Sequence, residues 1–208
     1  KMKYTTMQTR FDFLWVDYSL LILSFLILWN FFPVAGVIDL HLIYPFIDAN
    51  GKFPLREYWS LVELNHRYVK YLLILIYLTI LVGWLVSFKR QNWYNRRWEL
   101  GYFFCMVVLS TTLIGILKSQ SAHACPWNMI LPTSDGILWD FSATEGHCFP
   151  GGHASTGFAL IAGYFVYRIS NPKQAYFFLI AGMILGFTMG WAQMMRGAHF
   201  LSHNLWTG

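Results

Sequence analysis

The chain has 208 residues, of which 56% are hydrophobic and 12% are charged, and its formal net charge is +5. A soluble domain usually has about 25% charged residues, and here the apolar residues gather in runs of about 18 or more, long enough to cross a bilayer. Composition therefore excludes an ordinary soluble protein and predicts an all-α integral membrane protein. The positive charge does not indicate nucleic-acid binding, because no basic patch is interleaved with an aromatic stacking platform.

Five apolar segments are expected to cross the membrane. In chain order they are Tyr18–Ile38, Tyr71–Phe88, Leu100–Leu117, Ala154–Tyr167 and Ala175–Ala192. The fourth has 14 residues and needs the glycine-rich stretch before it to reach across. The residues after His203 resemble the first turn of a sixth span that is absent or incomplete in this chain. The sequence thus predicts five to six transmembrane helices.

The distribution of charge predicts the orientation, because lysine and arginine in short loops mark the cytoplasmic side. With the N-terminus inside, the inner segments hold nine cations and three acids, and the outer segments hold six cations and seven acids. We therefore expect a cytoplasmic N-terminus, with segments 39–70, 118–153 and 193–203 on the outer face. These segments contain all seven histidines, the side chains best suited to proton transfer near neutral pH: His41, His66, His123, His147, His153, His199 and His203.

Three short stretches combine cationic, glycyl or imidazole groups at the outer ends of expected spans. They are KSQSAHACP at 118–126, PGGHAS at 150–155 and RGAHFLSH at 196–203. Because all three lie at one level of the membrane, they can meet in space. The amides of Gly151 and Gly152 precede an apolar helix, and such amides bind anions, above all phosphate. The alternative is an ordinary turn that opens a helix.

Two cations accompany these stretches. Lys118 ends an apolar span, where the alternative to phosphate binding is a lysine that extends to the membrane interface. Arg196 has apolar neighbours, among which an arginine without an anionic partner is costly, and guanidinium is the usual clamp for phosphate. His199 and His203 are four residues apart, a spacing that also suits a zinc or copper pair. No carboxylate or cysteine stands close in sequence to complete such a site, so we expect no metal and no cofactor.

In this order, the three stretches resemble the signature motifs of the type 2 phosphatidic acid phosphatase superfamily, K-x6-RP, PSGH and SR-x5-H-x3-D. The resemblance covers about residues 100–208 and extends to bacterial inner-membrane members, including lipid A phosphatases and phosphotransferases. It implies that His199 attacks phosphorus and forms a phosphohistidine, and that His153 protonates the leaving oxygen. It also implies that Lys118 and the amides of Gly151 and Gly152 hold the phosphate.

The chain departs from this pattern at four positions. Cys125 and Gln193 replace arginines of the first and third motifs, Gly151 replaces a serine and His203 replaces an aspartate. We expect Arg196, one helical turn from Gln193, to compensate as a phosphate clamp. We expect His203, less favourably Asn204, to orient His199 in place of the carboxylate.

Cys125 and Cys148 flank the first and second motifs on the outer side. We expect them to form a disulfide that ties the 118–153 loop together, since the periplasm permits disulfides.

The sequence divides into two parts. Residues 1–99 provide two transmembrane helices and the periplasmic segment 39–70. Residues 100–208 provide the helical-bundle phosphatase core.

The sequence predicts a multi-pass enzyme of the bacterial inner membrane that removes phosphate from a phospholipid, lipid A or an isoprenoid (pyro)phosphate at the periplasmic face. Phosphoryl transfer needs mainly positioning and charge stabilisation, and two imidazoles can act as nucleophile and acid without a metal. Three alternatives stay open: transfer of the phosphate to a second lipid such as lipid A, a non-catalytic relative that binds anionic lipid, and a metal transporter or sensor. The expected partner is a phosphorylated membrane lipid, and the sequence leaves the oligomeric state open.

Overall fold

A computed structural model describes the backbone of residues 2–134 and 136–208 and the side chains of residues 13–64, 67–134 and 136–208. Four helices of this part are long and apolar enough to cross a membrane. They are Phe13–Phe31 within α1 (Met2–Phe31); Ser60–Val86, which joins a π-helical segment (Ser60–Tyr68) to α3 (Val69–Val86); Gln91–Gln120, which ends in α4 (Arg97–Gln120); and α7 (Pro172–Met195). The prediction of an all-α membrane protein is confirmed.

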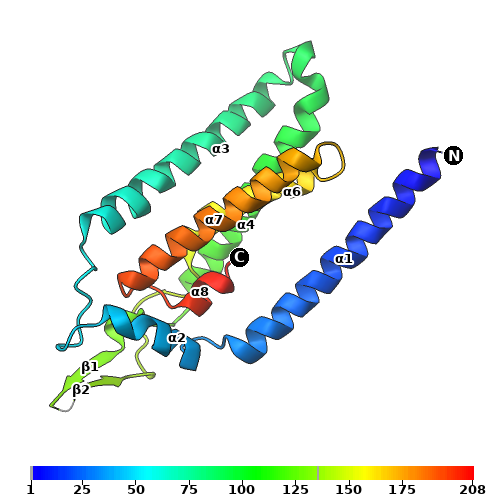
Figure 1. Cartoon of the computed structure of the whole chain (residues 1–208). Coiled ribbons are helices and arrows are strands. Elements are labelled where there is room, and N and C mark those ends of the chain that lie inside the picture. Colours follow the sequence, from blue (N-terminus) through cyan, green and yellow to red (C-terminus); the bar gives the residue numbers. More distant parts are fainter. Residues whose placement is uncertain (1, 135) are drawn as a thin grey trace.

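The fourth expected span is helical but shorter than these four. It consists of α5 (Gly152–Phe158), a 3-10 turn (Ala159–Ile161) and α6 (Ala162–Tyr167), which run side by side with α7 (Figure 1). Glycines allow this close approach: a Cβ atom at Gly157 would lie 2.6 Å from the backbone nitrogen of Gly186. Small residues let two helix backbones pack closely where no hydrophobic effect drives association.

The first expected span, Tyr18–Ile38, is wrong at its C-terminal end. Helix α1 ends at Phe31, and α2 (Val37–Ile43) begins after a turn in which Ala35 has a φ of 56°. Pro33 explains the break, because a proline disfavours helical geometry at the preceding residue and has no amide proton to donate. Ile38 therefore belongs to α2, a short apolar helix that follows the break.

The loop between α4 and α5 contains a β-hairpin that hydropathy did not predict. Strand β1 (Ile130–Thr133) pairs antiparallel with β2 (Gly136–Trp139), so that Ile130 lies opposite Trp139. After α7 the chain turns into α8 (Leu201–Leu205), which contacts both α7 and α2. The expected extramembrane segment 39–70 is partly helical, since its last third already belongs to the helix that begins at Ser60.

Two clusters of buried residues hold the molecule together. One joins α3, α4 and α7 to the α5–α6 segment: Leu73, Tyr77, Phe103, Val107, Ala159, Leu160 and Met189. The other joins the hairpin and α2 to the end of α7: Ile43, Phe53, Ala124, Met129, Ile130, Met194 and Phe200. The second cluster includes Ala124 of the first motif and Phe200 of the third, so it holds these two stretches in place.

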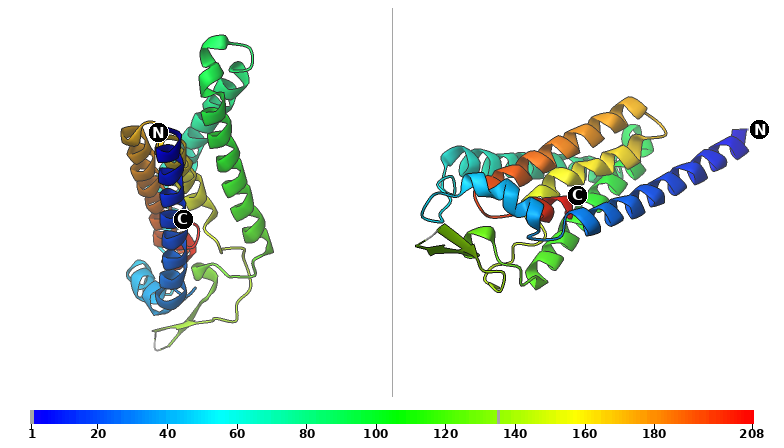
Figure 2. Two further views of the ribbon diagram at one scale, coloured as in Figure 1. Left: turned by 90° about the vertical axis from the view of Figure 1, so that its right-hand side faces the viewer. Right: turned by 60° about the horizontal axis from the view of Figure 1, so that its bottom comes forward.

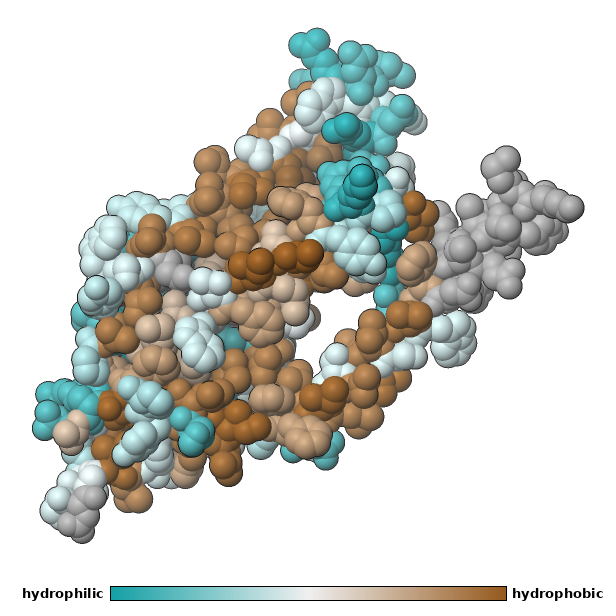
Figure 3. Space-filling model, viewed as in Figure 1, coloured by the Kyte–Doolittle hydropathy of each residue, from teal (hydrophilic) through white to brown (hydrophobic). Residues whose placement is uncertain are grey.

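Helix α1 diverges from the rest of the bundle along most of its length (Figures 1 and 2), and its segment Phe13–Phe31 has no buried residue. It is tied to the bundle by Asp17, which accepts two hydrogen bonds from Arg168 at the end of α6, at 2.6 and 2.9 Å. Apolar side chains cover most of the bundle between more polar ends (Figure 3). This surface is suited to a lipid environment.

Candidate active site

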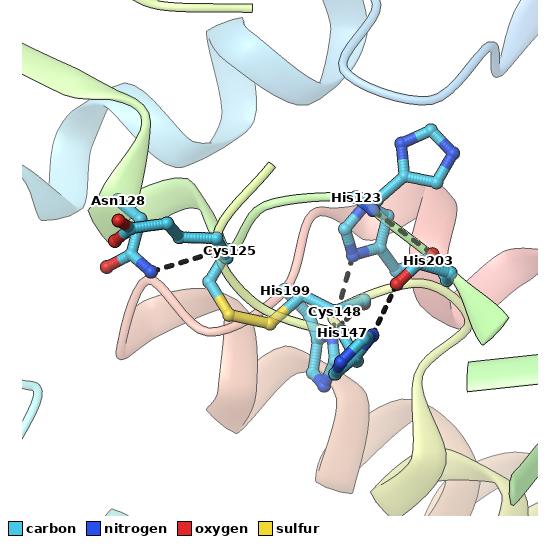
Figure 4. Close-up of a disulfide and its surroundings, with 9 residues drawn as sticks. His123, Cys125, Asn128, His147, Cys148, His199 and His203 are labelled. Carbon is cyan, nitrogen blue, oxygen red and sulfur yellow. Dashed lines mark hydrogen bonds between the residues drawn. A yellow bond between two sulfur atoms is a disulfide. The ribbon is translucent and has the colours of Figure 1, made fainter. Parts of the chain in front are cut away.

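The 118–153 loop is tied together at its base. A disulfide joins Cys125 to Cys148, whose Cα atoms are 5.1 Å apart. The amide of Cys148 donates to the carbonyl of His123 at 3.0 Å, and the Asn128 side chain donates to the carbonyl of Glu145 at 3.0 Å (Figure 4). These contacts hold the first motif beside the residues that precede the second.

The third motif leaves α7 through a tight turn. Gly197 has a φ of 74°, its amide donates to the Met194 carbonyl at 2.9 Å, and the Ala198 amide donates to the Gln193 carbonyl at 2.9 Å. This pattern is a Schellman motif, in which the left-handed position favours glycine. A Cβ atom at Gly197 would also overlap the ring of Phe53. The turn directs His199 into the interior, where it is only 3% exposed.

The imidazole of His199 has a defined hydrogen-bond partner. Its Nδ1 lies 2.6 Å from the backbone carbonyl oxygen of Cys148 and 3.3 Å from Nδ1 of His203. Because a carbonyl only accepts, Nδ1 of His199 carries the proton and Nε2 keeps its lone pair. Burial, together with the charges of Lys118 and His203, holds the pKa of His199 well below its usual value. The side chain is therefore a neutral imidazole at neutral pH, as a nucleophile must be.

His203 lies on α8, fully buried between the rings of Phe149 and Phe200, whose centroids are 5.5 and 5.4 Å away. Burial, His123 and Lys118 lower the pKa of His203 to about 3, so it is neutral at neutral pH. Its Nε2 atom has no hydrogen-bond partner within the described part of the chain. His203 therefore occupies the position of the family aspartate without supplying a negative charge.

Lys118 and the start of α5 approach the same two histidines. A Cβ atom at Gly152 would lie 3.3 Å from Cδ of Lys118, so the lysine stem covers this glycine. The charges of Lys118 and His153 both act on His199. The structure thus brings together Lys118, Gly152, His153, His199 and His203 from three separate segments.

Two of the expected phosphate ligands, Gly151 and Arg196, donate hydrogen bonds to other groups of the protein. The Gly151 amide donates to the His203 carbonyl at 3.0 Å and to the Thr207 hydroxyl at 2.8 Å. Nε of Arg196 donates to the Arg56 carbonyl at 2.8 Å, and its Nη1 donates to the Gln193 side chain at 3.3 Å. Gly151 thus attaches the second motif to α8, and Arg196 attaches the end of α7 to the loop before α3.

The sequence assigned no individual role to three groups at this site. Asp39 of α2 is 2% exposed and accepts hydrogen bonds from the amide of Ser202, at 2.8 Å, and from its hydroxyl. His123 packs its ring against Phe149, with centroids 5.3 Å apart, and Phe149 also contacts the ring of His203. The third is the Cys148 carbonyl. The position of Asp39 directly after an apolar run is the one sequence feature that indicates a role for this acid. A backbone carbonyl, by contrast, cannot be recognised in a sequence.

No group of three or more histidine, cysteine, aspartate or glutamate side chains that could hold a metal ion occurs among the residues the structure describes. Comparison with protein families matches residues 99–207 to the model of the PAP2 superfamily. The chain belongs to the PAP2 superfamily. Searches of curated proteins and of solved structures return no match.

Membership of the PAP2 superfamily confirms the resemblance of the three motifs. PAP2 proteins are generally phosphatases, so the family indicates a hydrolase that acts on phosphorylated substrates. The matched region contains every histidine and cation assembled above.

Proposed function

We propose that this PAP2 protein is a membrane lipid phosphatase that works through a phosphohistidine at His199. The observation that carries this proposal is the hydrogen bond of 2.6 Å from Nδ1 of His199 to the Cys148 carbonyl, which leaves the Nε2 lone pair available beside Lys118. A buried neutral imidazole with one nitrogen fixed is an activated nucleophile.

The reaction has two steps. Nε2 of His199 attacks phosphorus as the bond to the leaving oxygen breaks, and His153 gives that oxygen its proton. Water then attacks the phosphohistidine, His153 takes one proton from the water, and inorganic phosphate leaves with His199 restored. Lys118 stabilises the negative charge that the phosphoryl oxygens carry in both transition states.

An apolar cavity next to these residues supports a lipid as the substrate. It has a volume of about 690 Å³ and is lined by Trp29, Pro33, Val34, Ile114, Leu117, Phe149, Pro150 and Trp206. Phe149 contacts the ring of His203, Pro150 precedes the glycine pair, and Leu117 precedes Lys118. A ligand whose phosphate lies near Lys118 would therefore have its apolar chain in this cavity. The volume is typical of small-molecule sites.

The charge distribution supports a location of this site at the periplasmic face of a bacterial inner membrane. With the N-terminus inside, the outer segments are nearly neutral and the inner ones are strongly basic. An oxidising compartment also suits the disulfide between Cys125 and Cys148.

The proposal is tested with purified protein and lipids labelled in the phosphate: phosphatidic acid, phosphatidylglycerol phosphate, an isoprenoid diphosphate and lipid A. Hydrolysis releases the label as free phosphate, and we expect His199→Ala to abolish this release. His41→Ala, which changes an exposed histidine of α2, is the matched control and should retain full activity. Label that moves from a donor lipid to lipid A would instead show a phosphotransferase. Lipid binding without turnover, unchanged in His199→Ala, would show a non-catalytic relative.

A further inference from the structure

The acceptor for Nδ1 of His199 differs from the one in the family pattern. That pattern has an aspartate four residues after the histidine, where this chain has His203. The two Nδ1 atoms are 3.3 Å apart, whereas the Cys148 carbonyl oxygen is 2.6 Å from Nδ1 of His199. The shorter contact, to an atom that only accepts, determines which nitrogen carries the proton.

The position of that carbonyl depends on the disulfide. Cys148 lies in an irregular loop, outside any helix or strand. It is held by the bond to Cys125 and by its own amide, which donates to the His123 carbonyl at 3.0 Å. The Cys125 end is itself anchored next to His199, because the amide of Trp127 donates to the Gly197 carbonyl at 3.0 Å.

We propose that the Cys125–Cys148 disulfide positions the nucleophile: it holds the Cys148 carbonyl where it accepts the proton of His199 Nδ1, the role of the missing aspartate. This inference rests on the proposed function. It follows that phosphatase activity requires the disulfide and hence an oxidising compartment. Reduction by a dithiol transfers two electrons and two protons, yields two cysteine thiols and a cyclic disulfide of the reductant, and releases the carbonyl.

The first test compares the oxidised wild type with the double variant Cys125→Ser/Cys148→Ser. We expect kcat to fall about 100-fold with little change in KM, since misplacement of a reacting group by about 1 Å has effects of this size. The control is Cys105→Ser, which removes the exposed free thiol of α4 and should keep wild-type kcat. Wild-type kcat in the double variant would overturn the proposal.

A spectroscopic measurement separates positioning from a merely structural role. With ¹⁵N-labelled histidine, nuclear magnetic resonance reports which ring nitrogen carries the proton, and His199→Gln assigns the signal. We expect His199 to be protonated at Nδ1 in the oxidised protein and to populate both tautomers once the disulfide is lost. A lower melting temperature alone, with the His199 tautomer unchanged, would overturn the proposal.

A rescue experiment tests the same role. His203→Asp restores the carboxylate of the family pattern, and it should raise kcat of the cysteine-free double variant at least about tenfold. A folded triple variant that stays as inactive as the double variant contradicts the proposal. If the double variant does not fold, folded wild type that has been reduced with dithiothreitol replaces it. The reduction needs a long incubation, because Cys125 and Cys148 are only 6% and 7% exposed.

The outcome also distinguishes failure of this inference from failure of the proposed function. If the oxidised wild type hydrolyses none of the labelled lipids, the proposed function fails, and the tautomer measurement alone decides the inference. If the wild type is active and the double variant equally so, the disulfide has no positioning role while the phosphatase function stands.

Discussion

The carboxylate of Asp39 accepts hydrogen bonds from both the backbone amide and the hydroxyl of Ser202, 163 residues further along the chain. Ser202 is the second residue of α8 and directly precedes His203. The contact therefore caps the helix that carries one of the buried histidines and attaches it to α2. A carboxylate at a helix N-terminus is favoured by the free amides there and by the helix dipole.

Asp39→Asn should lower both stability and activity. The amide nitrogen of asparagine cannot accept, and the backbone amides of Ser202 and Ala35 donate to different carboxylate oxygens of Asp39. One of these two amides therefore loses its acceptor, at a cost of about 1–3 kcal/mol. The thermal midpoint in detergent and kcat for lipid phosphate measure the effect. Glu57→Gln, which changes an exposed carboxylate that pairs with the exposed Arg56, should leave both unchanged. A wild-type midpoint in Asp39→Asn would show that α8 does not depend on this contact.

The two glycines of the second motif should respond differently to alanine. In Gly151→Ala the new methyl group would overlap the side-chain oxygen of Asn204 and lie 3.3 Å from the His203 carbonyl, so α8 must move. Movement of the Asn204 side chain instead would break its hydrogen bonds to the carbonyls of Gly190 and Phe200. In either case we expect a loss of about 1–3 kcal/mol in stability and a fall in kcat. In Gly152→Ala the methyl group meets only the flexible stem of Lys118, so stability should be kept and the KM for lipid phosphate should rise.

Gly115→Ala is the control for this pair, because nothing lies within 4 Å of a Cβ atom at that position of α4. Melting curves and steady-state kinetics of the three variants make the comparison. Equal behaviour of Gly151→Ala and Gly115→Ala would contradict the close contact between the second motif and α8.

Acid should destabilise the folded protein through its buried histidines. The pKa of His203 falls to about 3 on folding and that of His199 falls well below its usual value, so below about pH 6.5 the unfolded state binds more protons than the folded state. Stability is then lost as the pH falls from about 6.5, by about 1.4 kcal/mol per pH unit for each histidine.

His203→Gln isolates one of these contributions, because the other titrating groups are common to both proteins. The thermal midpoint of the wild type should fall more steeply between pH 7 and pH 5 than that of His203→Gln. Parallel midpoints over this range would mean that His203 is not buried in its neutral form.

Lys118 and Arg196 should differ in what they contribute. Lys118→Gln removes the cation beside His199 and should lower kcat by about 100-fold. Arg196→Gln removes the hydrogen bond to the Arg56 carbonyl, so we expect a loss of about 1 kcal/mol in stability and a smaller effect on kcat. Kinetics and melting curves decide. An Arg196→Gln variant with wild-type stability and a kcat as low as that of Lys118→Gln would identify Arg196 as a phosphate clamp.

Hydropathy and motif spacing were enough to predict the helical membrane architecture and the three segments that meet. Apolar runs determine where a chain can cross a bilayer, and motifs at the outer ends of spans lie at one level. Hydropathy extends the first span to Ile38, which is wrong because Pro33 ends the helix for steric reasons.

The contacts that orient the site were beyond the reach of the sequence. Asp39 contacts Ser202 only because α2 folds against α8. The acceptor at Cys148 is a backbone carbonyl, which every residue type has, so the sequence does not indicate it. Arg196 appeared as a phosphate clamp from its spacing to Gln193, yet its guanidinium binds the carbonyl of Arg56, which no spacing reveals. Tertiary contacts between distant segments decide such partners.

The most direct test of the account is the detection of phosphate on His199. The oxidised protein is mixed with lipid labelled in the phosphate, quenched within one turnover and digested, and the peptide that contains 197–203 is examined by mass spectrometry. We predict a phosphohistidine at His199 that disappears as free phosphate is released. Release of phosphate at the wild-type rate by His199→Ala would contradict the account.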